Sequence, residues 1–210
     1  MKPVLVSSIA VACFVAYSWQ CLAAEEAIKY ASPDGRFALR ITRATDDEYH
    51  PMVELIEKHS GRVLVTLHTG QEDTDLFDAS EAILVWSNDS KRVAYGFRAN
   101  PPGARVAERG ALVCFWNGSG FDKVFLPEEL PVPDVKFPQG QGGNVKSYGA
   151  GVRPLRWFKS GDLELASEDM LFSRDDNKTY TGVLRCTISF DAQHRPSVNS
   201  VGKTKTQVSK

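Results

Sequence analysis

A short polar turn followed by a strand of alternating apolar residues recurs three times, and this recurrence restricts the fold more than any other feature of the sequence. The polar corners lie at Asp34, Asp89 and Asp162. Asp and Asn side chains hydrogen-bond to their own backbone in such turns, while Gly supplies the positive φ. The strands that begin at Phe37 and Val93 carry an apolar residue at every second position. Because a period of two is typical of a strand with one buried face, the chain is predicted to be all-β.

Each of these hairpins is followed by a second one, so the repeating unit is a four-stranded antiparallel meander. The second hairpins are predicted at residues 52–67, 111–126 and 183–201. No stretch shows a convincing helical period. We therefore predict a single domain from Glu25 to Val201 built from three meander units, followed by a disordered polar tail at 202–210.

The turn Ser32-Pro33-Asp34-Gly35, with its alternating strand, resembles the repeat of TolB-type (WD40-like) β-propellers, whose blades open with a Trp-Ser-Pro-Asp-Gly-like turn. The second copy, Trp86–Asp89, keeps the Trp, Ser and Asp, and the third keeps the aromatic residue at Trp157. Residues Ser173–Tyr180 resemble the Asp-box of sialidases, which in that family is a structural hairpin turn. These resemblances imply a propeller-like architecture.

Three units are too few for an ordinary ring, because a propeller closes with roughly 4–8 blades. We therefore expect a propeller-like partial ring. A rearranged β-sandwich stays open as an alternative, as does a ring of six units assembled by two chains. The last alternative would make the protein a homo-oligomer.

The first residues have the layout of a secretory signal peptide. Lys2 gives a basic start, an apolar run extends over Val4–Tyr17, and the small residues Ala23 and Ala24 precede an acidic pair. The run is shorter than the roughly 20 apolar residues that span a bilayer, so no transmembrane anchor is expected. Removal of residues 1–24 would leave a mature chain that is periplasmic or extracellular.

Two cysteines, Cys114 and Cys186, remain after the predicted cleavage. A remaining pair often forms a disulfide in an oxidising compartment, and two buried, unreactive thiols are the alternative. Both cysteines lie at even offsets from the ends of their predicted strands, so both face the same side of their own unit. Equivalent sides of stacked units do not meet, which argues against the disulfide.

The segment between the second and third units, residues 131–154, is rich in Pro and Gly and is predicted to be a long loop. Long loops in compact domains are either functional or simply mobile, and both interpretations stay open here. The segment and its flank are basic and aromatic, which suits an anionic or sugar-like ligand or a partner protein. The candidate binding residues are Lys136, Phe137, Lys146, Tyr148, Arg153 and Arg156.

Motifs for known chemistries are missing from the sequence. The His residues lack the spacing of metal ligands, no Ser lies in a Gly-x-Ser-x-Gly elbow, and no Gly-rich loop carries the Lys of a phosphate site. The 25 basic and 26 acidic residues give a net charge of −1, which provides no reason to expect nucleic acid as a partner. No catalytic residue, metal or cofactor is therefore predicted.

Export without a catalytic motif favours a non-catalytic binding or interaction protein of the cell envelope or periplasm. Its partner would be an envelope protein or a polysaccharide. The alternative is a secreted hydrolase acting on sugars or peptides. A hydrolase would need two carboxylates, or an acid beside a His, in one pocket and with shifted pKa values.

Overall fold

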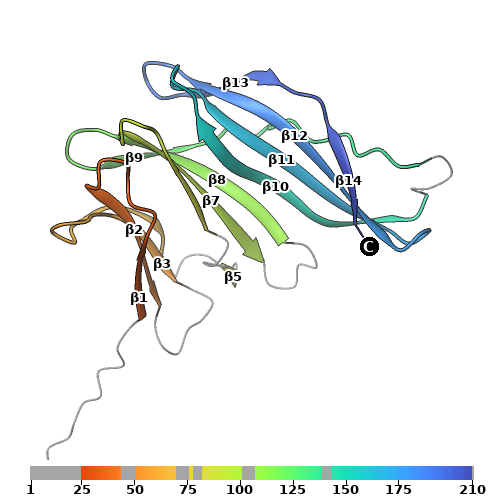
Figure 1. The fold of residues 1–210 in the computed structure, drawn as a ribbon, viewed down its shortest axis with the longest axis horizontal. Coiled ribbons are helices and arrows are strands. Elements are labelled where there is room, and N and C mark those ends of the chain that lie inside the picture. Colours follow the sequence, from red (N-terminus) through yellow and green to blue (C-terminus); the bar gives the residue numbers. More distant parts are fainter. Residues whose placement is uncertain are drawn as a thin grey trace, which may run out of the picture.

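All the regular structure in the described part of the chain is β-strand, which confirms the all-β prediction (Figure 1). The computed structural model describes residues 25–43, 51–69, 76–77, 82–100, 107–138 and 143–209. Within these ranges there is no helix long and apolar enough to span a bilayer. The predicted signal peptide, residues 1–24, lies outside the described residues.

The first meander unit is a separate four-stranded antiparallel sheet in the order β1-β2-β3-β4. Its strands are β1 (Glu25–Lys29), β2 (Phe37–Arg43), β3 (Met52–Glu57) and β4 (Val63–His68). The corner at Asp34 joins β1 to β2, as the sequence pattern predicts.

The second and third units are also antiparallel meanders. The second consists of β6 (Ile83–Trp86), β7 (Arg92–Asn100), β8 (Ala107–Trp116) and β9 (Phe121–Phe125), and the short β5 (Leu76–Phe77) adds to the end of β7. The third consists of β10 (Val145–Trp157), β11 (Leu163–Ser173), β12 (Lys178–Phe190) and β13 (Pro196–Val201).

A parallel pairing between β8 and β10 joins the second and third units into one ten-stranded sheet, whereas the sequence pattern predicts three four-stranded units. The pairing covers Ala107–Arg109 of β8 and Gly149–Gly151 of β10. Strand β9 pairs only with Leu112–Trp116 of β8. The beginning of β8 therefore has an edge that β9 does not cover, and β10 supplies hydrogen-bonding partners for it.

The three units stack on one another (Figure 1). Alternation along β7 sends successive side chains into two different cores. Val93 and Tyr95 lie in the first core, where they meet Phe37 and its neighbours from unit one. Ala94 lies in the second core with Leu163 and its neighbours from unit three. Unit two is thus buried on both faces.

The turns at Asp34 and Asp89 have the same hydrogen bonds, which explains why similar residues recur there. Ser32 Oγ donates to Asp34 at 2.7 Å, and Ser87 Oγ donates to Asp89 at 2.5 Å. In both turns the amide two residues after the aspartate donates to the same carboxylate at 3.1 Å. Two of the three predicted corners are therefore equivalent.

The third corner is one residue shorter, so Asp162 is not the equivalent of Asp34. The closing bond runs from Phe158 N to Asp162 O, whereas the first turn closes from Ser32 N to Phe37 O. Gly161 takes the left-handed position, with a φ of 100°. In the first turn Asp34 directly precedes the left-handed Gly35, and in the third turn Ser160 holds that place before Gly161.

Tryptophan side chains link each unit to the preceding one at equivalent backbone positions. Trp86 Nε1 donates to the Tyr30 carbonyl at 2.8 Å, and Trp157 Nε1 donates to the Val85 carbonyl at 3.0 Å. Tyr30 and Val85 each lie two residues before the first hydrogen-bonded residue of their own turn. The repeated Trp therefore fixes how successive units dock.

The turn carboxylate of Asp34 should make stability depend on acid pH. Burial alone would raise its pKa, but bonds from Ser32 Oγ, the Arg36 amide and the Arg36 guanidinium lower the pKa to about 2. A lowered pKa contributes stability above the unfolded value near 3.8, and that stability is lost as the pH falls toward 2. Because the side chain is 34% exposed, the contribution should stay below about 1 kcal/mol.

We therefore expect Asp34→Asn to be less stable than the wild type at pH 7, with most of this difference gone at pH 2. Urea unfolding at both pH values measures the difference. A gap of the same size at both pH values would contradict the assignment.

Cys114 and Cys186 are free, buried thiols that lie in different cores, so the structure contains no disulfide between them. Cys114 points from unit two toward unit one, and Cys186 points from unit three toward unit two. This is the arrangement expected when equivalent sides of stacked units do not meet.

Both thiols should resist alkylation in the folded protein. Burial raises the pKa of Cys114 to about 12 and also raises the pKa of Cys186, so neither forms the reactive thiolate near neutral pH. Iodoacetamide treatment followed by mass measurement should show no label on the folded chain from Glu25 onward. It should show two labels after denaturation without reductant. Failure to label the denatured chain would instead reveal a disulfide.

The C-terminal tail forms a strand, contrary to the expectation of disorder at 202–210. Strand β14 (Lys205–Ser209) pairs with the first part of β12, while β13 pairs with its last part. The amides of Asp134 and Lys136 donate to the Thr204 and Thr206 hydroxyls, so residues 131–138 run along the tail. These contacts explain why this part of the predicted loop is packed.

Candidate functional site

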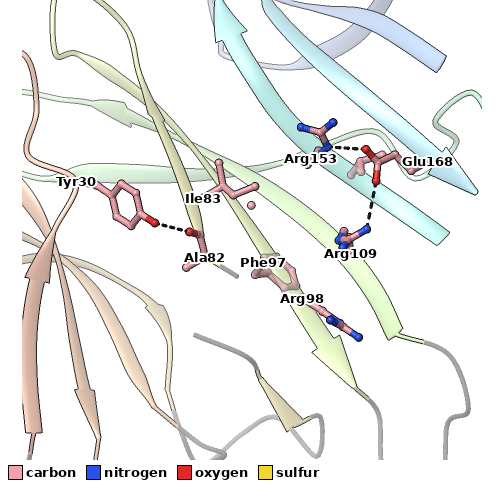
Figure 2. Close-up of a pocket in the computed structure, with 10 residues that line it drawn as sticks. Tyr30, Ala82, Ile83, Phe97, Arg98, Arg109, Arg153 and Glu168 are labelled. Carbon is pink, nitrogen blue, oxygen red and sulfur yellow. Dashed lines mark hydrogen bonds and ion pairs between the residues drawn. The ribbon is translucent and has the colours of Figure 1, made fainter. Parts of the chain in front are cut away.

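A pocket of about 480 Å³ lies where the three units meet (Figure 2). Tyr30 lines it from unit one, β6 and β7 line it from unit two, and β10 and β11 line it from unit three. Its described lining consists of Tyr30, Ala82, Ile83, Gly96, Phe97, Arg98, Arg109, Val152, Arg153 and Glu168. Three arginines and one carboxylate thus share a wall with apolar side chains.

The register of four neighbouring strands places the charged residues in one row. Glu168 of β11 pairs with Gly151 of β10, Gly151 pairs with Arg109 of β8, and Arg109 pairs with Arg98 of β7. Paired residues on adjacent strands project from the same face of a sheet. Gly151 contributes no side chain to this row, so the side chains of Glu168 and Arg109 meet across it.

The Glu168 carboxylate bridges two arginines. It accepts from Arg153 Nε at 2.6 Å and from Arg109 at 3.2 Å, and its side chain is only 13% exposed. Figure 2 shows this carboxylate between the two guanidinium groups, with Tyr30 on the opposite side of the pocket. The bridge fixes the positions of both cations at the pocket wall.

Arg153 is the cation best placed to receive a ligand. Its side chain is 39% exposed, and its bond to Glu168 uses Nε. The two terminal nitrogens of a guanidinium form a planar fork that matches the oxygens of a carboxylate or phosphate. Arg153 therefore combines a fixed position with donors that face outward.

A smaller pocket of about 90 Å³ adjoins the first along β10. It shares Arg98, Arg109 and Glu168 with the larger pocket and adds Tyr148 and Met170. Because the two pockets share these three residues, we call them together the arginine recess.

The six sequence-predicted binding residues do not form one surface. Tyr148 and Arg153 line the arginine recess. The Phe137 ring packs on the buried Tyr180 at 4.7 Å, which indicates a structural role. Lys136 pairs with Asp134 on the same packed segment.

The other two predicted residues lie outside the recess. Lys146 is exposed at the start of β10. Arg156 pairs with Glu164 at 2.9 Å and places its guanidinium over the Phe158 ring. Neither lines a described part of the arginine recess.

Sequence reasoning missed Arg98, Arg109 and Glu168. The alternation of side chains could have found two of them. Arg98 lies four residues after the buried Ala94 on β7, and Arg109 lies four residues before the buried Val113 on β8, so each arginine is on the same strand face as a core residue. A charge at a position where alternation places a core residue marks a buried polar site. Arg109 meets Glu168 only because β8 pairs with β10, and the alternation of apolar residues does not predict which strands pair.

A second pocket, of about 300 Å³, lies beside the turns at the other end of the second core. The His194 ring stacks on Phe115 there at 3.9 Å, and Asp89 and Asp191 are nearby. Asp191 accepts from amides of its own turn, and these bonds lower its pKa. Burial works against ionisation of Asp89, but bonds from the Ser87 hydroxyl and the Lys91 amide still lower its pKa. These carboxylates therefore serve their own turns.

Among the described residues, no three or more His, Cys, Asp or Glu side chains gather as a metal site would require. Comparison with known proteins found no match to any family model, curated protein or solved structure.

Proposed function

We propose that this protein is an exported, non-catalytic binding protein of the cell envelope or periplasm, and that it holds an anionic group of its ligand in the arginine recess. The observation that carries the proposal is the Glu168 bridge, which fixes Arg109 and Arg153 at the wall of a pocket shared by three units. The ligand would be a polysaccharide or an envelope protein that carries acidic groups.

A pre-positioned guanidinium is suited to binding because little freedom remains to be lost when the ligand arrives. Arg153 is held by Glu168 on one side and is open to the pocket on the other. Ile83, Phe97 and Val152 supply an apolar wall, which strengthens charge-assisted hydrogen bonds by excluding water. A few placed polar groups in a largely apolar concavity are typical of ligand sites.

The proposed architecture is a propeller-like partial ring of TolB-type repeats. The matching turns at Asp34 and Asp89 and the Trp-to-carbonyl links between successive units support it. The shared sheet of units two and three departs from separate blades. The arginine recess lies where units two and three join, because the β8–β10 pairing brings Arg109 beside Glu168.

The pocket beside the turns is less suited to hydrolysis than its mixture of acids and a His suggests. A general acid at neutral pH needs a raised pKa, whereas the pKa values of Asp89 and Asp191 are lowered. Both carboxylates also accept hydrogen bonds within their own turns. The geometry therefore favours binding over catalysis.

Thermal unfolding with citrate at constant ionic strength tests the proposal. At a citrate concentration about 100-fold above its Kd, the midpoint of the wild-type chain should rise by about 5 °C or more. Arg153→Gln should lose most of this rise. Arg195→Gln should keep it, because Arg195 pairs with Asp191 in a distant turn. An equal rise in all three proteins, or no rise in the wild type, would contradict the proposed site.

A further inference from the structure

Each of the two pockets of the arginine recess is lined by an exposed tyrosine, and three of the charged residues are common to both pockets. Tyr30 lines the larger pocket, and Tyr148 lines the smaller one. Arg109 and Glu168 line both, so they lie between the two rings. A ligand that fills the recess would meet an aromatic surface, then ionic groups, then a second aromatic surface.

The Tyr30 ring is held in position although its side chain faces solvent. Its hydroxyl donates to the Ala82 carbonyl at 2.9 Å, and its own carbonyl accepts from Trp86 Nε1. The residue is 43% exposed. A fixed and accessible ring of this kind offers a flat apolar face at little cost in conformational entropy.

Tyr148 offers a second accessible ring, since it is 59% exposed on β10. It is also one of the aromatic residues that the sequence pattern selects for binding. Two exposed tyrosines therefore line the same recess as the arginines and Glu168.

The backbone next to Tyr148 is paired with a neighbouring strand on both sides. Gly149–Gly151 pair with β11 on one side and with β8 on the other. An extended peptide that binds by strand addition needs a free sheet edge, and this part of β10 has none. Recognition in the recess therefore depends on side chains.

We propose that the arginine recess binds an acidic oligosaccharide, a chain of sugar units of which at least one carries a carboxylate. This inference rests on the proposed function and names its ligand class. The apolar faces of sugar rings would lie on Tyr30 and Tyr148, and the sugar carboxylate would pair with the terminal nitrogens of Arg153. The Glu168 carboxylate would accept a sugar hydroxyl.

Isothermal titration with three matched probes tests the ligand class: trigalacturonate, the neutral trisaccharide maltotriose and the acidic peptide triglutamate. Trigalacturonate should bind the wild-type chain at least tenfold more tightly than either of the other two. Its affinity should fall at least tenfold in Arg153→Gln and at least threefold in Tyr148→Ala, and it should be unchanged in Arg195→Gln.

The outcomes separate the inference from the function beneath it. If triglutamate binds at least as tightly as trigalacturonate and depends on Arg153, the sugar inference is overturned and the proposed anion site stands. If trigalacturonate binding survives Tyr148→Ala undiminished, the aromatic part of the inference is overturned. If no acidic probe depends on Arg153, the proposed function falls together with the inference.

Discussion

Trp157→Ala should destabilise the protein by about 3 kcal/mol, because it removes a large ring from the second core together with a link between two units. The ring packs against Phe115 and Phe190, with centroids 6.2 Å and 5.8 Å away. Its Nε1 donates to the Val85 carbonyl at 3.0 Å. Equilibrium urea unfolding of the chain from Glu25 onward measures the loss as a lowered midpoint with an unchanged slope.

Two Trp→Phe variants separate the link from the packing. Trp116 packs against Phe37 and Phe121 in the first core, and its indole nitrogen donates to no described residue. Trp157→Phe should therefore cost about 1 kcal/mol more than Trp116→Phe, the usual net value of one hydrogen bond. Equal losses would show that the indole bond contributes nothing to the docking of units two and three.

Gly151→Ala should be at least as damaging, with an expected loss of about 3 kcal/mol or more. Gly151 has a φ of 145°, and a Cβ built there would lie 2.1 Å from the Arg109 carbonyl oxygen and 2.6 Å from its nitrogen. These backbone atoms belong to the β8–β10 pairing and cannot move without breaking it. The same substitution would separate Arg109 from Glu168 and thereby distort the arginine recess.

Gly118→Ala is the matched control for Gly151→Ala. Gly118 also has a positive φ, of 103°, but a Cβ there would meet nothing within 4 Å. Its substitution should cost only the backbone strain, about 1–2 kcal/mol. A Gly151→Ala variant no less stable than Gly118→Ala would contradict the close approach of β10 to β8.

The parts of the fold that could be predicted from sequence are those set by local chemistry. The alternating apolar residues after Asp34 and Asp89 indicate a strand with one buried face. The Ser and Asp side chains that precede them indicate the turn. The third corner is misleading because its turn is one residue shorter and carries Ser160 in the aspartate position, so Asp162 lies two residues too late. The polar composition of the tail suggests disorder. The tail forms a strand because β12 is long enough to pair with both β13 and β14.

The candidate site was only partly predictable, because its geometry comes from pairing between distant segments. Tyr148 and Arg153 were found through the basic and aromatic composition of their surroundings. Arg109 reaches Glu168 only because the beginning of β8 pairs with β10, a contact between units. Composition cannot separate Arg153, which lines the recess, from Arg156, which pairs with Glu164 outside it.

Nuclear magnetic resonance of the arginine Nε–Hε groups during a citrate titration tests the anion site most directly, because it locates the bound charge at individual side chains. The Arg153 and Arg109 signals should shift along one saturating curve, while the signal of Arg195 stays in place. Equal shifts of Arg153 and Arg195, or a stationary Arg153 signal at saturating citrate, would contradict the assignment of the recess as the binding site.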